Sequence, residues 1–158
     1  MTTATADSTA SNQPGNGGAT AGLPGEVQGR IAAFFERQFA ERMRTHPADR
    51  AAESPKPLPD WAIIGAAKSA TTSLCATLQA MPGVAPVAIK ESDYFASERM
   101  HALGQAWYAS LWEGGAARGE SCGEASTAYT RRPMHEGAAE RLAASNPDCR
   151  VVYLVREP

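Results

Sequence analysis

A single lysine lies among small and hydroxyl-bearing residues in the segment Gly65–Ser73, which reads Gly-Ala-Ala-Lys-Ser-Ala-Thr-Thr-Ser. Small residues let backbone N–H groups approach an anion closely, and the start of a following helix adds partial positive charge. Lys68 supplies a mobile full charge, and Thr71, Thr72 and Ser73 supply hydroxyl donors. The segment is therefore predicted to bind a phosphate group.

The spacing within this segment differs from that of a nucleoside-triphosphate loop. A Walker A motif places its lysine after Gly and directly before Ser or Thr. Here Lys68 precedes Thr71 by three positions, and no magnesium-binding Asp follows a later strand. A P-loop nucleotide kinase or hydrolase is therefore a lesser alternative. The non-functional alternative is an incidental turn in which Ser or Thr caps a helix.

Three further segments carry groups suited to the same chemistry. The segment Lys90–Phe95 places the carboxylate of Glu91 beside aromatic rings, which would partly desolvate it and make it a better proton acceptor. The segment Gly123–Tyr129 contains a second acidic residue among small and hydroxyl-bearing ones. The segment Val152–Pro158 ends an apolar run with Arg156, whose planar guanidinium suits a phosphate group.

In this order the four segments resemble the PAPS-dependent sulfotransferases, in particular the bacterial and glycan-type sulfotransferase domain. The first is similar to Lys-x-Gly-Thr-Thr, with Ala70 where Gly is usual, and the second to Lys-Glu-Pro-x-Phe-Phe. The third is similar to Gly-Glu-x-Ser-Pro-x-Tyr, and the fourth to a strand that ends in Arg-Asp/Asn-Pro. The resemblance covers Trp61–Pro158, the N-terminal portion of such a domain.

The resemblance implies transfer of a sulfuryl group from PAPS (3′-phosphoadenosine-5′-phosphosulfate) to a hydroxyl or amine of a small-molecule, glycan or lipid acceptor, with release of PAP. Lys68 would neutralise the leaving phosphate oxygen, Glu91 would accept the acceptor's proton, and Arg156 would contact the 3′-phosphate. The 5′-phosphosulfate would be held by the loop residues Lys68, Ser69, Ala70, Thr71, Thr72 and Ser73. Two roles stay open: Glu91 could be a solvated acid paired with Lys90 or a nearby Arg, and Glu124 could orient neighbouring groups or cap backbone amides.

The pattern of apolar residues predicts the elements that position these groups. Short apolar runs predict strands at residues 61–64, 84–89 and 150–155, and helical spacing predicts helices at 72–81, 100–112 and 136–145. Strands that alternate with helices indicate an α/β fold of P-loop type, with a parallel sheet flanked by helices. The candidate residues then follow the carboxyl ends of strands, where open α/β sheets bind their ligands.

Three segments precede this core, which spans residues 60–158. Residues 1–25 have too few large apolar groups to offset the entropy of ordering and are predicted to form a disordered tail. Residues 26–46 are predicted to form an amphipathic helix, which is either a packing helix or a partner-binding or dimerising one. Residues 47–59 hold four prolines and are predicted to be a linker.

Composition excludes several classes of partner. A formal net charge of −2 argues against a nucleic-acid or anionic-membrane binder, since those partners require a strongly basic face. No apolar run is long enough for a membrane span, and no secretory signal is recognisable. The three cysteines show no metal-ligand spacing. We expect a cytoplasmic protein that binds PAPS or PAP and a sulfate acceptor, uses no metal, and is a candidate homodimer.

The chain stops at Pro158, directly after the strand predicted at 150–155. We therefore expect a sheet that is incomplete at its C-terminus. This raises the alternative of a truncated, non-catalytic fragment that acts at most as a PAP- or PAPS-binding or interaction module.

Overall fold

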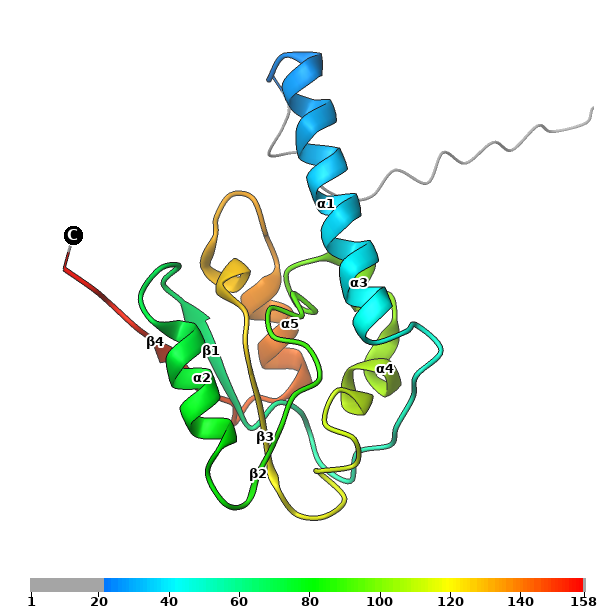
Figure 1. The fold of residues 1–158 in the computed structure, drawn as a ribbon, viewed down its shortest axis with the longest axis vertical. Helices are drawn as coiled ribbons and strands as arrows, with labels where there is room; N and C mark the ends of the chain where they lie inside the picture. The colour runs from blue at the N-terminus through cyan, green and yellow to red at the C-terminus, as the bar shows by residue number, and fades with distance from the viewer. Residues whose placement is uncertain (1–21, 158) are drawn as a thin grey trace, which may run out of the picture.

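The computed structural model describes residues 22–157 and has an α/β fold (Figure 1). All four strands of its sheet are parallel, in the order β2-β3-β1-β4. The strands are β1 (Trp61–Gly65), β2 (Val84–Ala85), β3 (Ser121–Ala125) and β4 (Arg150–Tyr153). The helices are α1 (Gly25–Thr45), α2 (Thr71–Gln79), α3 (Glu98–His101), α4 (Gly104–Ser110), α5 (Ala138–Ser145) and the 3-10 helix η1 (Thr127–Thr130).

Helices cover both faces of the sheet. Neighbouring side chains in a strand point to opposite faces, so Ile63 packs with Cys75 of α2 whereas Ala62 joins a second apolar cluster. This second cluster is rich in fully buried aromatic side chains, contributed by the loop before α3, by α4 and by the turn that follows α4: Tyr94, Phe95, Trp107, Tyr108 and Trp112. The two clusters pack the sheet between α2 on one face and helices on the other. The connecting loops lie at the carboxyl ends of the strands, which form the carboxyl edge of the sheet.

The close contact between β1 and β3 depends on a glycine. A Cβ atom at Gly123 would lie 2.0 Å from the indole of Trp61, the residue paired with it across the two strands. Any side chain at position 123 would therefore displace the ring. This packing explains the glycine that precedes Glu124 in the third of the sequence segments.

Several predicted elements are confirmed, with shifted boundaries. The strand predicted at 61–64, the helices predicted at 72–81 and 136–145, and the amphipathic helix are all present. The strand predicted at 150–155 forms as Arg150–Tyr153, but it is an edge strand, and Val151 and Tyr153 are 53% and 52% exposed. Residues 47–59, predicted to be a linker, form no helix or strand, and Leu58 and Pro59 at their end are buried in the core.

Two predicted elements differ from the structure in extent, and one strand was missed. The strand predicted at 84–89 ends at Ala85, because Pro86 has no N–H to donate to a ladder. The helix predicted at 100–112 is two helices, broken at Gly104, whose φ of 83° leaves the right-handed helical region. Strand β3 was not predicted at all, although it lies inside the sheet, because its sequence Ser-Cys-Gly-Glu-Ala lacks the usual run of branched and aromatic residues.

Helix α1 rests on the body through its C-terminal half and projects beyond it at its N-terminal end (Figure 1). Arg42, which the amphipathic pattern places on the polar side, is in fact buried against the loop that carries Glu91. The tail predicted at 1–25 lies almost wholly outside the described residues. Across residues 22–157, no helix combines the length and apolar character needed to cross a bilayer.

Candidate functional site

The loop between β1 and α2 presents a row of backbone donors. Within residues 22–157, the N–H groups of Ala67, Lys68, Ala70, Thr71, Thr72 and Ser73 donate to no protein acceptor. Only the N–H of Ser69 is used, by the carbonyl of Ala66 at 3.2 Å. Because unpaired amides at a helix start attract anions, the loop has the donor set of an anion cradle.

Two residues of the loop adopt the left-handed conformation. Lys68 has a φ of 66° and Ala70 a φ of 62°. Ala70 occupies the N-cap position of α2, and no side chain of the described residues caps this helix. The alternative of a turn capped by Ser or Thr is therefore not what the structure contains.

The side chains of the loop are available to a ligand. Lys68, Thr72 and Ser73 are exposed, whereas Thr71 is buried and Ser69 is partly buried. In the described part of the chain, Lys68 forms no ion pair, and the hydroxyls of Thr72 and Ser73 form no hydrogen bond. The sequence-predicted loop thus exposes one cation and two hydroxyl groups beside the free amides.

Arg156 lies beside this loop because β4 lies beside β1. The N–H of Leu154 donates to the carbonyl of Gly65, and the N–H of Ala66 donates back to Leu154, both at 2.8 Å. The Nη1 of Arg156 then makes a long contact of 3.5 Å to the carbonyl of Lys68. Two of the predicted anion-binding residues are therefore adjacent, and both are exposed.

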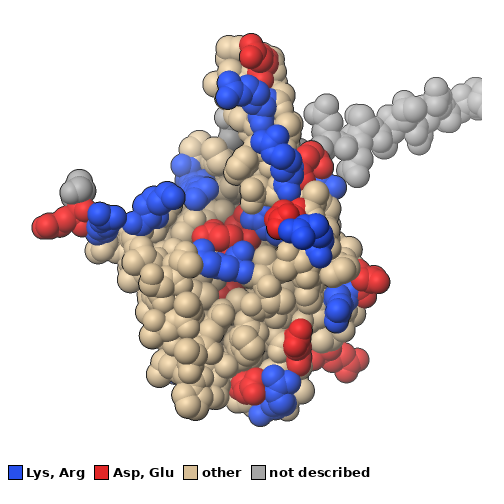
Figure 2. Space-filling view, viewed as in Figure 1, with Lys and Arg blue, Asp and Glu red and all other residues tan. Residues whose placement is uncertain are grey.

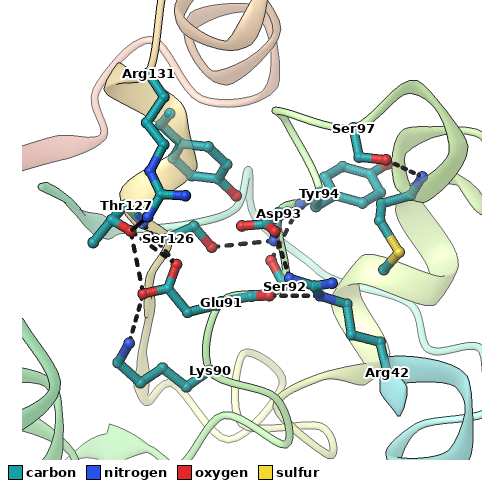
Figure 3. Close-up of polar contacts among 12 residues, drawn as sticks. Arg42, Lys90, Glu91, Ser92, Asp93, Tyr94, Ser97, Ser126, Thr127 and Arg131 are labelled. Carbon is teal, nitrogen blue, oxygen red and sulfur yellow. Dashed lines mark hydrogen bonds and ion pairs between the residues drawn. The ribbon is translucent and has the colours of Figure 1, made fainter. Parts of the chain in front are cut away.

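Glu91 lies at the same carboxyl edge, beyond β3 (Figure 3). Its N–H donates to the carbonyl of Ala125, the last residue of β3, at 3.0 Å. Lys90 Nζ lies 2.7 Å from its Oε1, and the N–H of Thr127 donates to its Oε2 at 2.9 Å. Glu91 is thus paired with Lys90, as one of the two interpretations of the sequence expected, and Thr127 orients the carboxylate.

The aromatic neighbours of Glu91 do not surround its carboxylate. Tyr94 and Phe95 are buried in the core, where Tyr94 stacks on Tyr108 with ring centroids 4.2 Å apart. The Glu91 side chain stays 32% exposed. Contrary to the sequence-based expectation, ionic and hydrogen-bond contacts rather than apolar rings define its environment.

Glu124 is fully buried, and four hydroxyl groups converge on its carboxylate. Its Oε1 accepts from Tyr108 and Tyr129, each at 2.6 Å. Its Oε2 accepts from Ser92 at 2.6 Å and from Ser126 at 2.8 Å. Burial first, and then the negative charge of Glu124, raise the pKa of both tyrosines well above their usual value. Within residues 22–157, Glu124 therefore accepts from side-chain hydroxyls and caps no backbone amide, which favours the first of the two roles left open by the sequence.

A second acid in the same loop is held from α1. Arg42 Nε donates to the carbonyl of Glu91 at 2.7 Å, and its Nη2 forms an ion pair with Asp93. Asp93 is largely buried, and its Oδ1 has no hydrogen-bond partner among residues 22–157. Burial raises its pKa to about 6 despite the nearby guanidinium. The N–H of Asp93 also donates to Ser126 Oγ at 3.2 Å.

The structure brings the predicted residues to one edge of the sheet in two groups. Lys68 and Arg156 are in contact, whereas no hydrogen bond or ion pair joins either of them to Glu91 within the described chain. Sequence reasoning missed Arg42 and Thr127, which support the Glu91 loop. The Gly123–Tyr129 segment was a signal for Thr127, but nothing in the sequence links Arg42 to a loop so far along the chain.

Comparisons with protein-family models, with curated proteins and with solved structures found no match to this chain. The chemistry of the edge therefore rests on its residues. A free-amide loop with a lysine, an arginine beside it and a supported carboxylate can bind a ligand with two anionic groups and can accept a proton.

Proposed function

We propose that the protein binds PAPS at this edge and transfers its sulfuryl group to an acceptor hydroxyl or amine. The observation that carries the proposal is the row of unpaired amides beside exposed Lys68, with Arg156 next to it. PAPS carries anionic groups at both ends of its ribose, and these two sets of donors suit a ligand of that kind. On this proposal the strand β1, the loop and α2 form a P-loop-type unit.

Each group has a defined part in the proposed reaction. The loop amides and the hydroxyls of Thr72 and Ser73 hold the 5′-phosphosulfate, and Arg156 holds the 3′-phosphate. The bond between sulfur and the bridging phosphate oxygen breaks as the acceptor oxygen or nitrogen bonds to sulfur, and Lys68 stabilises the charge on the leaving phosphate. Glu91 accepts the acceptor's proton, and the Thr127 N–H keeps its carboxylate oriented.

Calorimetric titration with PAP in the presence of EDTA tests the proposal. We expect binding by the unmodified protein and no measurable binding by Lys68→Ala, because the variant lacks the full charge of the loop. Arg37→Ala is a matched control, since Arg37 is an exposed cation on α1 away from the edge. Unchanged affinity of Lys68→Ala for PAP would contradict the proposal, and magnesium-dependent ATP binding in its place would support a nucleotide kinase or hydrolase. A sulfuryl-transfer assay then separates an active enzyme from a binding module.

A further inference from the structure

The carboxyl edge of the sheet contains one cation that the proposed cofactor site does not use. Arg42 is paired with Asp93 and Lys90 with Glu91. Arg141 forms no ion pair either, but it is partly buried and donates to the carbonyls of Phe95 and Glu136. Among the residues that the structure describes, the exposed cations of this edge without an ion pair are Lys68, Arg156 and Arg131. Figure 2 shows positive side chains spread over this side of the molecule around a patch of acidic ones. Because PAPS would bind to Lys68 and Arg156, Arg131 stays available for an anionic group of another ligand.

Arg131 is separated from the Glu91 carboxylate by a single side chain. Its Nη2 donates to Thr127 Oγ1 at 3.0 Å, and Thr127 Oγ1 in turn lies 3.2 Å from Glu91 Oε2. Figure 3 shows the guanidinium pointing from the end of η1 toward this carboxylate. Arg131 is exposed, and the contact with Thr127 is its one side-chain hydrogen bond within residues 22–157, so most of its five N–H donors are free.

The positions of these groups along the sheet separate two binding regions. Lys68 follows β1 and Arg156 follows β4, on one half of the strand order, whereas Glu91 and Arg131 follow β2 and β3 on the other half. An acceptor must place its reacting group near the base, and a free guanidinium beside the base favours an anionic group on that acceptor.

We propose that Arg131 is a specificity-determining residue that binds an acidic group, either a carboxylate or a sulfonate-like oxyanion, on the acceptor. This inference rests on the proposed function, since it assigns the acceptor half of the same site. It names a class of substrates: acceptors with a hydroxyl or amine and a negative charge close to it. Arg131 would orient such a molecule, while Glu91 takes its proton.

The test measures binding of matched probes to protein saturated with PAP, by saturation-transfer NMR titration. PAP occupies the Lys68 and Arg156 region, so an anionic probe must use another cation. The probes are 4-hydroxybenzoate, 4-hydroxybenzenesulfonate and the neutral 4-hydroxybenzamide, which share the phenol and differ in the charged group. We expect the anionic probes to bind about tenfold more tightly than the amide, the effect of one charge-assisted contact. The sulfonate and carboxylate arms show which oxyanion is preferred.

Variants connect that preference to one side chain. Arg131→Ala should bind all three probes equally, and Arg131→Lys should keep part of the preference, because a point charge retains attraction without the planar fork. Arg132→Ala is the matched control: Arg132 is the next residue, is exposed and pairs with Glu140 at 3.4 Å, so the preference should persist. Unchanged thermal unfolding of each variant shows that the fold is intact.

Each other result overturns the inference in a recognisable way. Equal binding of charged and neutral probes by the PAP-saturated unmodified protein refutes it and leaves the proposed function standing. A loss of PAP affinity in Arg131→Ala as large as in Lys68→Ala places the guanidinium on the cofactor and also refutes it. Failure of the unmodified protein to bind PAP removes the proposed function and this inference together.

Discussion

The buried carboxylate of Glu124 joins three segments of the chain through four side-chain hydroxyls. Tyr108 comes from α4, Ser92 from the loop after β2, and Ser126 and Tyr129 from the region after β3. A carboxylate has about four acceptor positions, and all of them are used here. The loop that carries Glu91 is therefore held from beneath by a polar network inside an apolar core.

We expect Glu124→Gln to destabilise the protein by about 2–4 kcal/mol, because an amide nitrogen would face hydroxyls that now donate and would leave buried groups unpaired. Urea unfolding at pH 7 measures the change. Glu120→Gln is the matched control: Glu120 is paired with Arg118 near the surface, and we expect a much smaller change. Equal effects of the two substitutions would show that the network contributes little.

The left-handed backbone at Ala70 leads to a stabilising substitution. A residue with a Cβ atom costs about 1–2 kcal/mol in this conformation, whereas glycine adopts it freely at an entropic cost of about 0.5–1 kcal/mol. Ala70→Gly should therefore raise the free energy of unfolding by up to about 1 kcal/mol. Ala67→Gly, in the same exposed loop but without positive φ, should lower it by a similar amount. Denaturant unfolding of the two variants checks the opposite signs, and a loss of stability in Ala70→Gly would refute the argument.

At the scale of single residues, side-chain type predicted the exposed charged groups at the carboxyl edge of the sheet. It did not predict the buried residues that hold the loops of this edge in place. Lys68 and Arg156 were predicted to bind two different phosphate groups of one cofactor, and the structure places them in contact. Arg42 could not be predicted, because its partners Glu91 and Asp93 lie about fifty positions away and a buried arginine on an amphipathic helix looks like a surface residue. The role of Glu124 could not be predicted either. An acidic side chain is rarely fully buried unless it is paired, and the partners of Glu124 could not be identified from the sequence.

Among the elements, the short strands were hardest to predict and the most important for the site. Strand β2 has two residues and β3 lacks a branched or aromatic run, so local propensity identified neither correctly. Their pairing with β1 is decided by tertiary packing, such as the indole of Trp61 lying against Gly123. The long apolar run at β4 was easy to identify, but its edge position could not be read from its composition.

The contact between α1 and the Glu91 loop predicts a pH dependence of stability. The pKa of Asp93 rises from 3.8 in the unfolded chain to about 6 in the fold, chiefly through burial. The folded state therefore binds this proton more tightly, and the stabilisation is complete below pH 4 and lost as pH rises through 6. Asp93→Asn mimics the protonated form, so the variant should match the parent near pH 4 and exceed it near pH 7, by at most about 3 kcal/mol.

Urea unfolding of Asp93→Asn and the parent protein from pH 4 to pH 7.5 measures this divergence. Asp49→Asn serves as control, because Asp49 is exposed and precedes the core. A difference between Asp93→Asn and its parent that stays constant over the whole range would show that burial of Asp93 is not coupled to folding.

For the molecule as a whole, the proposed cofactor spans two strands that are distant in the sequence. The Lys68 loop follows β1 and Arg156 follows β4, so both belong to one site only in the folded chain. A ligand that binds only the folded state raises its stability, by about 2.7 kcal/mol at a concentration one hundred times the dissociation constant. Saturating PAP should therefore raise the unfolding temperature by several degrees, with EDTA present, and this rise should be absent in Lys68→Ala.

Comparison of PAP with adenosine 5′-monophosphate then assigns the 3′-phosphate to Arg156, because the two nucleotides differ in that group alone. We expect the unmodified protein to bind PAP at least about tenfold more tightly, since one guanidinium–phosphate contact is worth about 1.5–3 kcal/mol. Arg156→Ala should bind both nucleotides with the weaker affinity, whereas Arg150→Ala, an exposed arginine at the start of the same strand, should keep the preference. If Arg156→Ala still distinguishes the two nucleotides, another group holds the 3′-phosphate. The segment after β4 would then contribute only its backbone hydrogen bonds to the start of the Lys68 loop, and no side chain, to the site.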